Sequence, residues 1–303
     1  MKPWTPLIAA TLGWGASIAL TRAVLENGVD TFAMLPVRMT FAMLTLLIVI
    51  AMGRRFRTLN PAAWRNGAVL GVVGMGAPMA LMTLALEDLP VSISGLLIAL
   101  IPVTTIAAAH FLVEGEKFQA KSLPGLMVSL LGTGILVGVG GSTIAGVDNL
   151  WRGVALVTTG VILAGVGGAL SRRFALEVTG EALVLPQFTV ATVFLFAIMP
   201  VFGNGGGVAS WSTADWVLVG LVGAVGTTLP FASFLVGATV NPASRLALTG
   251  YTVPVVAVLL AVIFLGEQIT PAIVTGAVLI IGGVALSERG TSHVPEPGVV
   301  TSR

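Results

Sequence analysis

The sequence predicts an all-α integral membrane protein with ten transmembrane helices, arranged as two inverted copies of a five-helix unit. Three observations lead to this prediction: the composition, a series of long apolar segments and an internal repeat. Of the 303 residues, 56% are hydrophobic and 9% are charged. So few charged side chains cannot cover the surface of a soluble protein of this size. We therefore expect the chain to lie in a lipid bilayer.

Ten apolar segments are long enough to cross a membrane. A span needs roughly 20 residues, because an α-helix rises about 1.5 Å per residue and the hydrocarbon layer is about 30 Å thick. Most tryptophans fall near the predicted ends, where an amphipathic ring suits the headgroup layer. The predicted spans lie near residues 4–22, 31–52, 67–86, 91–113, 122–140, 151–171, 182–202, 214–236, 243–265 and 269–287.

The basic residues predict the orientation of the spans. With a cytoplasmic N-terminus, nearly all Lys and Arg side chains fall on the cytoplasmic side, and only Arg22 and Arg152 fall on the other. This asymmetry is typical of bacterial inner-membrane proteins and places both termini in the cytoplasm. The polar segment 288–303 is predicted to be a disordered cytoplasmic tail.

Prolines recur between the two halves of the chain at a nearly constant spacing, which indicates an internal duplication. The matched pairs are Pro36 and Pro186, Pro78 and Pro230, Pro90 and Pro242, and Pro102 and Pro254. The predicted units are residues 1–148 and 149–287, with five spans each. Because five is odd, the second unit enters the membrane from the opposite face, an arrangement that secondary transporters use for alternating access.

Four of these prolines are predicted to bend their spans. A mid-helix proline removes one hydrogen bond and displaces the carbonyl four residues earlier. Unwound backbone at bilayer depth must be packed in protein or line a cavity. We therefore predict Pro102 and Pro254, with Pro78 and Pro230, as gating or hinge positions, and a simple packed kink is the alternative.

Trp14 is the one tryptophan predicted at mid-span, and small residues surround it. A buried indole N–H needs a partner, so Trp14 is a candidate for the wall of a solute cavity. Met, Phe, Tyr and hydroxyl side chains elsewhere in the spans could complete such a pocket, although helix hydroxyls more often bond to their own helix. The further candidate substrate-binding residues are Ser17, Met79, Met82, Thr83, Thr228, Phe231 and Tyr251, with Thr21 and Thr249 as additional hydroxyls.

Three ionisable residues within the spans are candidates for function, because charge is costly there. Arg38 is predicted to form a structural or gating pair. Arg245 either reaches the cytoplasmic interface or anchors a solute carboxylate at a helix N-terminus. His110 is a candidate proton site, and a simple hydrogen bond is the alternative.

Several classes of protein are excluded or disfavoured. The chain has no cysteine and only two histidines, so no metal site or cofactor is predicted. The catalytic motifs of intramembrane enzymes are missing, and the scattered cations do not indicate nucleic-acid binding. We expect a small-molecule solute and the lipid bilayer as partners. Glycine rows at Gly125 and Gly132 and at Gly276 and Gly283 favour close packing of spans five and ten, or a homodimer.

Trp14-Gly15 in span one, Pro36 with Arg38 in span two, and a mid-span proline followed by Gly-Glu after spans four and nine resemble the EamA family of the drug/metabolite transporter superfamily. The resemblance implies a ten-helix basket with a central substrate cavity and, often, export of metabolites or amino acids. We expect a secondary transporter for small organic solutes. A passive lipid scramblase or a channel-like protein is the alternative. The acids of the two Gly-Glu pairs, Glu116 and Glu267, are expected to be structural, each held by an amide or a cation from a neighbouring helix.

Overall fold

The computed structural model describes residues 4–53, 60–114, 120–140, 149–203, 207–241 and 243–289, and every regular element within these ranges is helical. Nine of the described stretches are long and apolar enough to cross a membrane, and a tenth apolar helix, Pro271–Ser287, is shorter. The all-α, ten-span prediction is confirmed. Glu116, Pro242 and the tail beyond residue 289 lie outside the described residues.

The first half of the chain forms spans one to five. Its elements are α1 (Thr5–Glu26), α2 (Thr31–Gly53), α3 (Pro61–Val69), η1 (Leu70–Gly76), α4 (Ala77–Asp88), α5 (Val91–Ile98), α6 (Ile101–Leu112), η2 (Ala120–Ser122), α7 (Leu123–Ile135) and η3 (Leu136–Gly140). Span three runs through α3, η1 and α4. Span four runs through α5 and α6.

The second half forms spans six to ten. Its elements are α9 (Leu150–Phe174), α10 (Gly180–Phe202), η4 (Val208–Ser210), α11 (Thr213–Gly223), η5 (Ala224–Thr228), α12 (Leu229–Val240), α13 (Ala243–Leu265) and α14 (Pro271–Arg289). Span eight runs through α11, η5 and α12.

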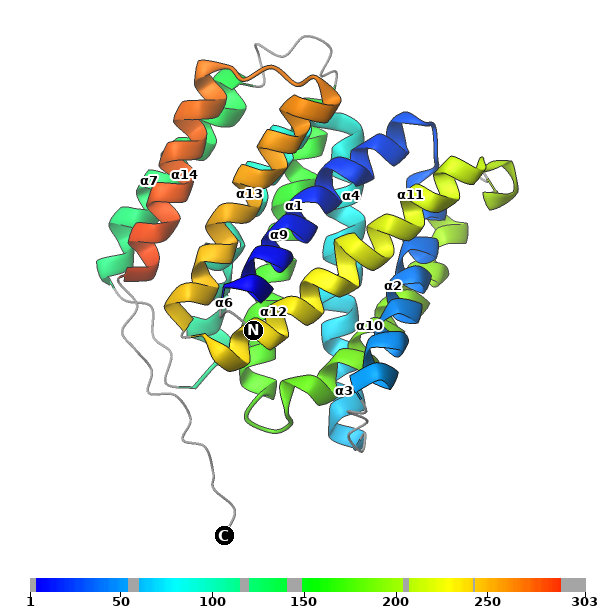
Figure 1. The fold of residues 1–303 in the computed structure, drawn as a ribbon. Helices are drawn as coiled ribbons and strands as arrows, with labels where there is room; N and C mark the ends of the chain where they lie inside the picture. The colour runs from blue at the N-terminus through cyan, green and yellow to red at the C-terminus, as the bar shows by residue number, and fades with distance from the viewer. Residues whose placement is uncertain are drawn as a thin grey trace.

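The helix contacts repeat when the two halves are exchanged. Helix α1 packs on α12 and α13, and its counterpart α9 packs on α4 and α6. Helix α2 packs on α11 and η5, and its counterpart α10 packs on α3 and η1. Helices α7 and α14 pair with each other at one edge of the bundle (Figure 1). Each half therefore covers the other, as expected for two inverted units. The start of α1 and the end of α14 lie towards the same end of the bundle (Figure 1).

Spans three and eight each contain a π-helical turn. The π segment η1 precedes α4, which has Pro78 in its first turn, and η5 likewise precedes α12 and Pro230. Proline has no backbone N–H to donate to the preceding turn of the helix. In both spans the wider π turn stands at this point. The Thr227 hydroxyl donates to the Val222 carbonyl, five residues earlier, at 2.9 Å. The helix departs from regular α-geometry directly before Pro78 and Pro230, and a bend of the spans at these prolines stays a prediction. Their use as hinges stays a prediction.

Spans four and nine differ, although both contain the matched proline. In span four the helix stops at Ala99 and Leu100, whose amides bond to Leu96 and Leu97 at 3.2 and 3.0 Å, and α6 begins afterwards with Pro102 in its first turn. In span nine α13 is one helix through Pro254. The matched prolines therefore lie in different local structure: two turn residues separate α5 from α6 just before Pro102, whereas α13 is continuous through Pro254. The kinks predicted at both prolines stay a prediction.

The glycine rows of α7 and α14 pack against each other within one chain. A Cβ on Gly125 would lie 2.5 Å from the Gly283 carbonyl oxygen, and one on Gly283 would lie 2.5 Å from the Ser129 amide nitrogen. A Cβ on Gly276 would lie 2.9 Å from the Cβ of Leu136. Only glycine permits this approach. Of the two uses that the sequence left open, these rows serve the packing of spans five and ten. A homodimer stays a prediction.

Candidate functional site

Arg38 is buried in the bundle and binds three hydroxyl groups from two other spans. It lies about two turns into α2 and is 7% exposed. Its Nε donates to Thr227 Oγ1 at 3.1 Å, Nη1 to Thr21 Oγ1 at 3.3 Å and Nη2 to Ser17 Oγ at 3.0 Å. We call Arg38, Ser17, Thr21 and Thr227 the arginine cluster. It joins α1 and α2 to η5 of the other repeat.

The hydroxyls of this cluster are oriented by their own helices. The Thr21 hydroxyl donates to the Ser17 carbonyl at 2.6 Å, as Thr227 does to Val222. Each oxygen is thereby left with lone pairs for the guanidinium. A Cβ on Gly226 would lie 2.8 Å from Ser17 Oγ, so a glycine is needed for η5 to approach α1 this closely.

The cluster contains a cation, Arg38, for which the described part of the chain provides no counter-ion. None of the ion pairs among the residues that the structure describes includes Arg38. A guanidinium has five N–H groups, and three hydrogen bonds are assigned to it. Charges buried in a membrane protein are normally paired with an opposite charge. The arginine cluster therefore presents a positive charge and unused donors inside the bundle.

An aromatic pair lies one turn along α1 from the cluster. Trp14 precedes Ser17 by three residues, and its ring centroid is 5.4 Å from that of Phe234 on α12. Trp14 is half-buried, and no hydrogen bond from its indole N–H is assigned to a described residue. Trp14 and Ser17, two of the predicted substrate-binding residues, thus lie one turn apart on α1, and Ser17 binds Arg38.

The other predicted substrate residues do not gather at one place. Met79 and Phe231 pack against the apolar cluster around Phe188, whereas Met82 and Tyr251 pack against a separate cluster around Leu97 and Ala85. Thr83 is buried. The Thr228 hydroxyl donates to the Ala42 carbonyl at 2.6 Å and so joins two helices. Thr249 is buried, and its hydroxyl has no partner among the described residues. Their role in binding stays a prediction.

Arg245 and His110 lie outside the arginine cluster. The Arg245 guanidinium stands 5.1 Å over the Trp4 ring, and its Nη1 lies 3.5 Å from Asn241 Oδ1, both near the start of α1 and α13. This geometry fits the interfacial alternative for Arg245. His110 is exposed in the last turn of α6, with its ring edge against Phe111 at 4.7 Å. Proton binding by His110 stays a prediction.

The midpoints of spans four and nine face each other. A Cβ on Gly250 of α13 would lie 3.5 Å from Cγ of Pro102. Gly250 is the residue whose carbonyl Pro254 leaves without a donor. The broken helix of one repeat thus crosses the continuous helix of the other near the two proline positions.

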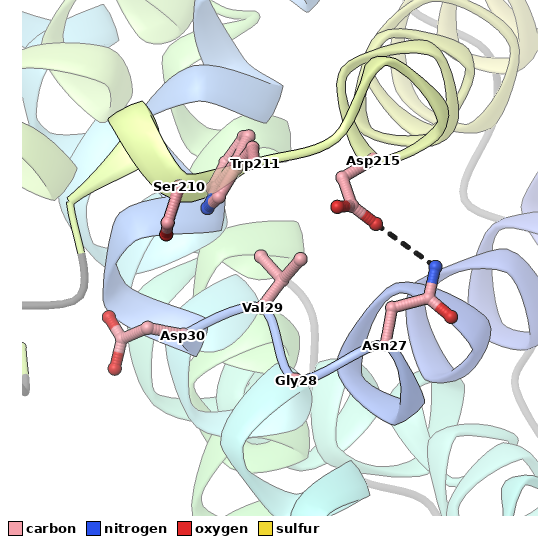
Figure 2. A pocket seen from close by; sticks show the side chains of 7 residues that line it. All are labelled: Asn27, Gly28, Val29, Asp30, Ser210, Trp211 and Asp215. Atoms are coloured by element: carbon pink, nitrogen blue, oxygen red, sulfur yellow. Dashed lines mark hydrogen bonds between the residues drawn. The ribbon is translucent and has the colours of Figure 1, made fainter.

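A small pocket that no sequence pattern predicted lies at the α1–α2 junction, outside the arginine cluster. Its volume is about 150 Å³. Figure 2 shows Asn27 and Asp215 joined across one side, at 3.0 Å. Asp215 also accepts from the amide and the hydroxyl of Ser212, so the protein itself uses this carboxylate. The lining residues are Asn27, Gly28, Val29, Asp30, Ser210, Trp211 and Asp215.

Comparisons with known proteins agree with this architecture. A sequence model described as the EamA-like transporter family matches residues 5–138 and, again, residues 151–289. A probable terminal-alkyne amino-acid exporter of Streptantibioticus cattleyicolor is 29% identical over 227 residues, which cover 74% of this chain and 73% of that protein. A solved crystal structure covers 94% of this chain and 96% of its own, with a TM-score of 0.65 at 22% identity, and shares the fold.

Proposed function

Because the chain belongs to the EamA-like transporter family, we propose that it is a secondary transporter that exports small amino-acid-like metabolites by alternating access. The relative named as a probable amino-acid exporter supports both the direction and the solute class. The partly exposed Trp14, one turn along α1 from the Ser17 that binds the buried Arg38, supports a zwitterionic or anionic solute with an apolar side chain.

The difference between spans four and nine is the observation that carries alternating access. In a transporter made of inverted repeats, each repeat takes up the conformation of the other when access changes sides. Here matched prolines lie in a helix that breaks at Ala99 and Leu100 and in a helix that continues through Pro254. In one end state of such a cycle the two repeats have different conformations. Spans four and nine differ in this way, and they contact each other at Pro102 and Gly250.

Counterflow in proteoliposomes tests the function. Vesicles loaded with an unlabelled amino acid should accumulate the labelled one transiently, with saturation and with competition among related solutes. A channel would give flux that does not saturate and no accumulation. A scramblase would move labelled lipid and no solute. Either of these results would overturn the proposal.

Substitution of Pro102 tests the conformational step. Pro102→Ala permits a continuous hydrogen-bonded helix through span four, so we expect slower counterflow with little change in solute binding. Pro36→Ala is the control, because Pro36 lies inside α2 and away from the crossing. Equal counterflow rates for Pro102→Ala and wild type would contradict a role of the break in transport.

A further inference from the structure

We propose that the arginine cluster recognises the carboxylate of the transported solute, with the Arg38 guanidinium as its binding group. This inference rests on the proposed transport function and assigns a chemical class, small organic carboxylates, to its solute. It follows from the missing counter-charge, from a comparison of the two repeats and from the position of the aromatic pair.

The second repeat shows how the same helix crossing is built without a charge. Helix α2 crosses span eight, and its counterpart α10 crosses span three. A Cβ on Gly223 would lie 3.1 Å from the Ala42 amide nitrogen, and a Cβ on Gly71 would lie 3.0 Å from the Ala191 amide nitrogen. The two crossings therefore have the same geometry, and their residues can be matched one to one.

Gln187 occupies the place of Arg38 in this match. Each lies one turn before the matched alanine, and the carbonyl of each faces the matched glycine. The structural match of Arg38 with Gln187 differs by one residue from the sequence match of Pro36 with Pro186. Gln187 is 9% exposed, close to the 7% of Arg38. A neutral amide is therefore sufficient at this depth and in this packing.

The hydroxyl partners of Arg38 are also specific to its side. A Cβ on Gly226 would lie 3.2 Å from the Cα of Ser17, and one on Gly74 would lie 3.3 Å from the Cα of Gly167, so Gly167 replaces Ser17. By the same register Met75 replaces Thr227. Only the Thr21 position keeps a hydroxyl, where Ser171 donates to its own helix at 2.9 Å, as Thr21 does. The matched crossing of the second repeat is therefore built without an arginine and with only one of its three hydroxyl partners.

A carboxylate would complete the cluster chemically. The two Nη atoms of a guanidinium match the two oxygens of a carboxylate, and such a pair is stronger than bonds to neutral hydroxyls. Ser17 and Thr21 could then turn their hydroxyl protons towards the same oxygens. Arg38 and Ser17 are buried, at 7% and 5% exposure, so a solute reaches them only when the transport cycle separates the helices around the cluster. The Trp14–Phe234 pair offers an apolar surface for the solute's side chain.

The test compares a carboxylate with its neutral amide in three variants. The probe is the amino acid that wild type transports best in counterflow, from a panel of the common amino acids and propargylglycine, together with its α-carboxamide. Arg38→Gln installs the residue of the matched position, so we expect it to fold. We expect the KM for the carboxylate to rise roughly tenfold or more, with a much smaller change for the amide. Ser17→Gly, likewise taken from the matched position, should raise the same KM less. Gln187→Met is the control and should leave it unchanged.

The outcomes separate this inference from the transport function. Transport of the carboxylate by Arg38→Gln with an unchanged KM, or wild-type preference for the amide, would overturn the inference and leave a working transporter. Equal losses for both solutes would also overturn it, because a merely structural arginine affects both alike. If Arg38→Gln does not fold, Ser17→Gly decides by the same selectivity. Absence of counterflow for every solute would overturn the proposed function itself.

Discussion

Glu267 joins the two repeats through a single side chain. Its Oε1 accepts from the Val91 amide at 2.6 Å and its Oε2 from the Ser92 amide at 3.0 Å, so the carboxylate caps the N-terminus of α5. Gly266, with φ at 68°, ends α13 and turns the chain towards α5. A negative charge is favourable at a helix N-terminus. The expectation that a neighbouring helix supplies amides for this acid is confirmed.

Neutralising Glu267 should loosen the start of α5. We expect Glu267→Gln to lower the free energy of local opening by about 1–2 kcal/mol, because an amide presents one acceptor oxygen in place of two charged ones. Hydrogen exchange at Val91 and Ser92 measures this directly. Gln268→Ala changes the exposed neighbour and should leave the exchange unchanged. Equal exchange in wild type and Glu267→Gln would show that the cap contributes nothing.

Single residues could be predicted where a charged or polar side chain lies within an apolar span, because its burial in lipid costs free energy. Arg38 and Trp14 stood out as a charge and an indole within apolar spans, and both lie at the candidate site. Thr227 was missed, because nothing in the sequence tells that η5 crosses α2. Met79 and Tyr251 match the composition of a pocket, and each packs, partly buried, against a different apolar cluster, so their role in binding stays a prediction. Composition alone does not distinguish a pocket wall from core.

Adjacent glycines in α14 have opposite surroundings. Gly283 is buried against Ser129, whereas a Cβ on Gly282 would meet nothing within 4 Å. We expect Gly283→Ala to destabilise the protein by about 1–3 kcal/mol, the usual effect of overpacking. Gly282→Ala should be neutral or slightly stabilising, because alanine favours the helix. Unfolding in mixed detergent micelles measures both. Equal effects would contradict the packing of α7 on α14.

The link between α9 and α10 is held to α3 by a carboxylate outside the spans. Glu177 Oε2 accepts from Asn66 at 3.0 Å and from Arg65 at 2.9 Å. The hydrogen bond from Asn66, followed by the charge of Arg65, lowers the pKa of Glu177 below its ordinary value of 4.5. Because the pKa is depressed on folding, this contact stabilises the protein above that ordinary value and is lost as the pH falls through the lower, folded value.

The effect of Glu177→Gln should therefore depend on pH. At neutral pH we expect a lower unfolding midpoint than that of wild type, and the difference should shrink as the pH falls below the ordinary carboxyl pKa. Thermal unfolding in detergent across this range measures it. Glu114→Gln, which removes an exposed carboxylate elsewhere in the protein, is the control. A midpoint difference that grows in acid would contradict the assigned contact.

Helix existence was predictable from the apolar segments, but the form of each bend was not. The sequence places matched prolines in spans four and nine, and only span four breaks. The residues before the two prolines differ, residues 98–101 in span four and 250–253 in span nine, and no local rule tells from them which of the two helices is interrupted. The π segments before Pro78 and Pro230 likewise depend on which helices cross there.

At the scale of the whole molecule, the exchange of contacts between halves agrees with an inverted repeat, and its orientation in the membrane is a prediction. A cysteine at exposed Leu176, in the α9–α10 link, should react with an impermeant reagent from the cytoplasm. One at exposed Ile269, after α13, should react from the other side. The chain has no native cysteine, so each label is unambiguous. Reaction of both from one face would exclude this topology.

The interlocked pair of α7 and α14 takes one helix from each half. Its glycine backbones touch, so neither helix can slide along the other without a clash. If the two halves tilt during transport, we expect α7 and α14 to stay packed together while the other eight spans move. A covalent cross-link between α7 and α14 should then leave the transport rate unchanged. This edge of the bundle is therefore suited to the attachment of a probe or a tether.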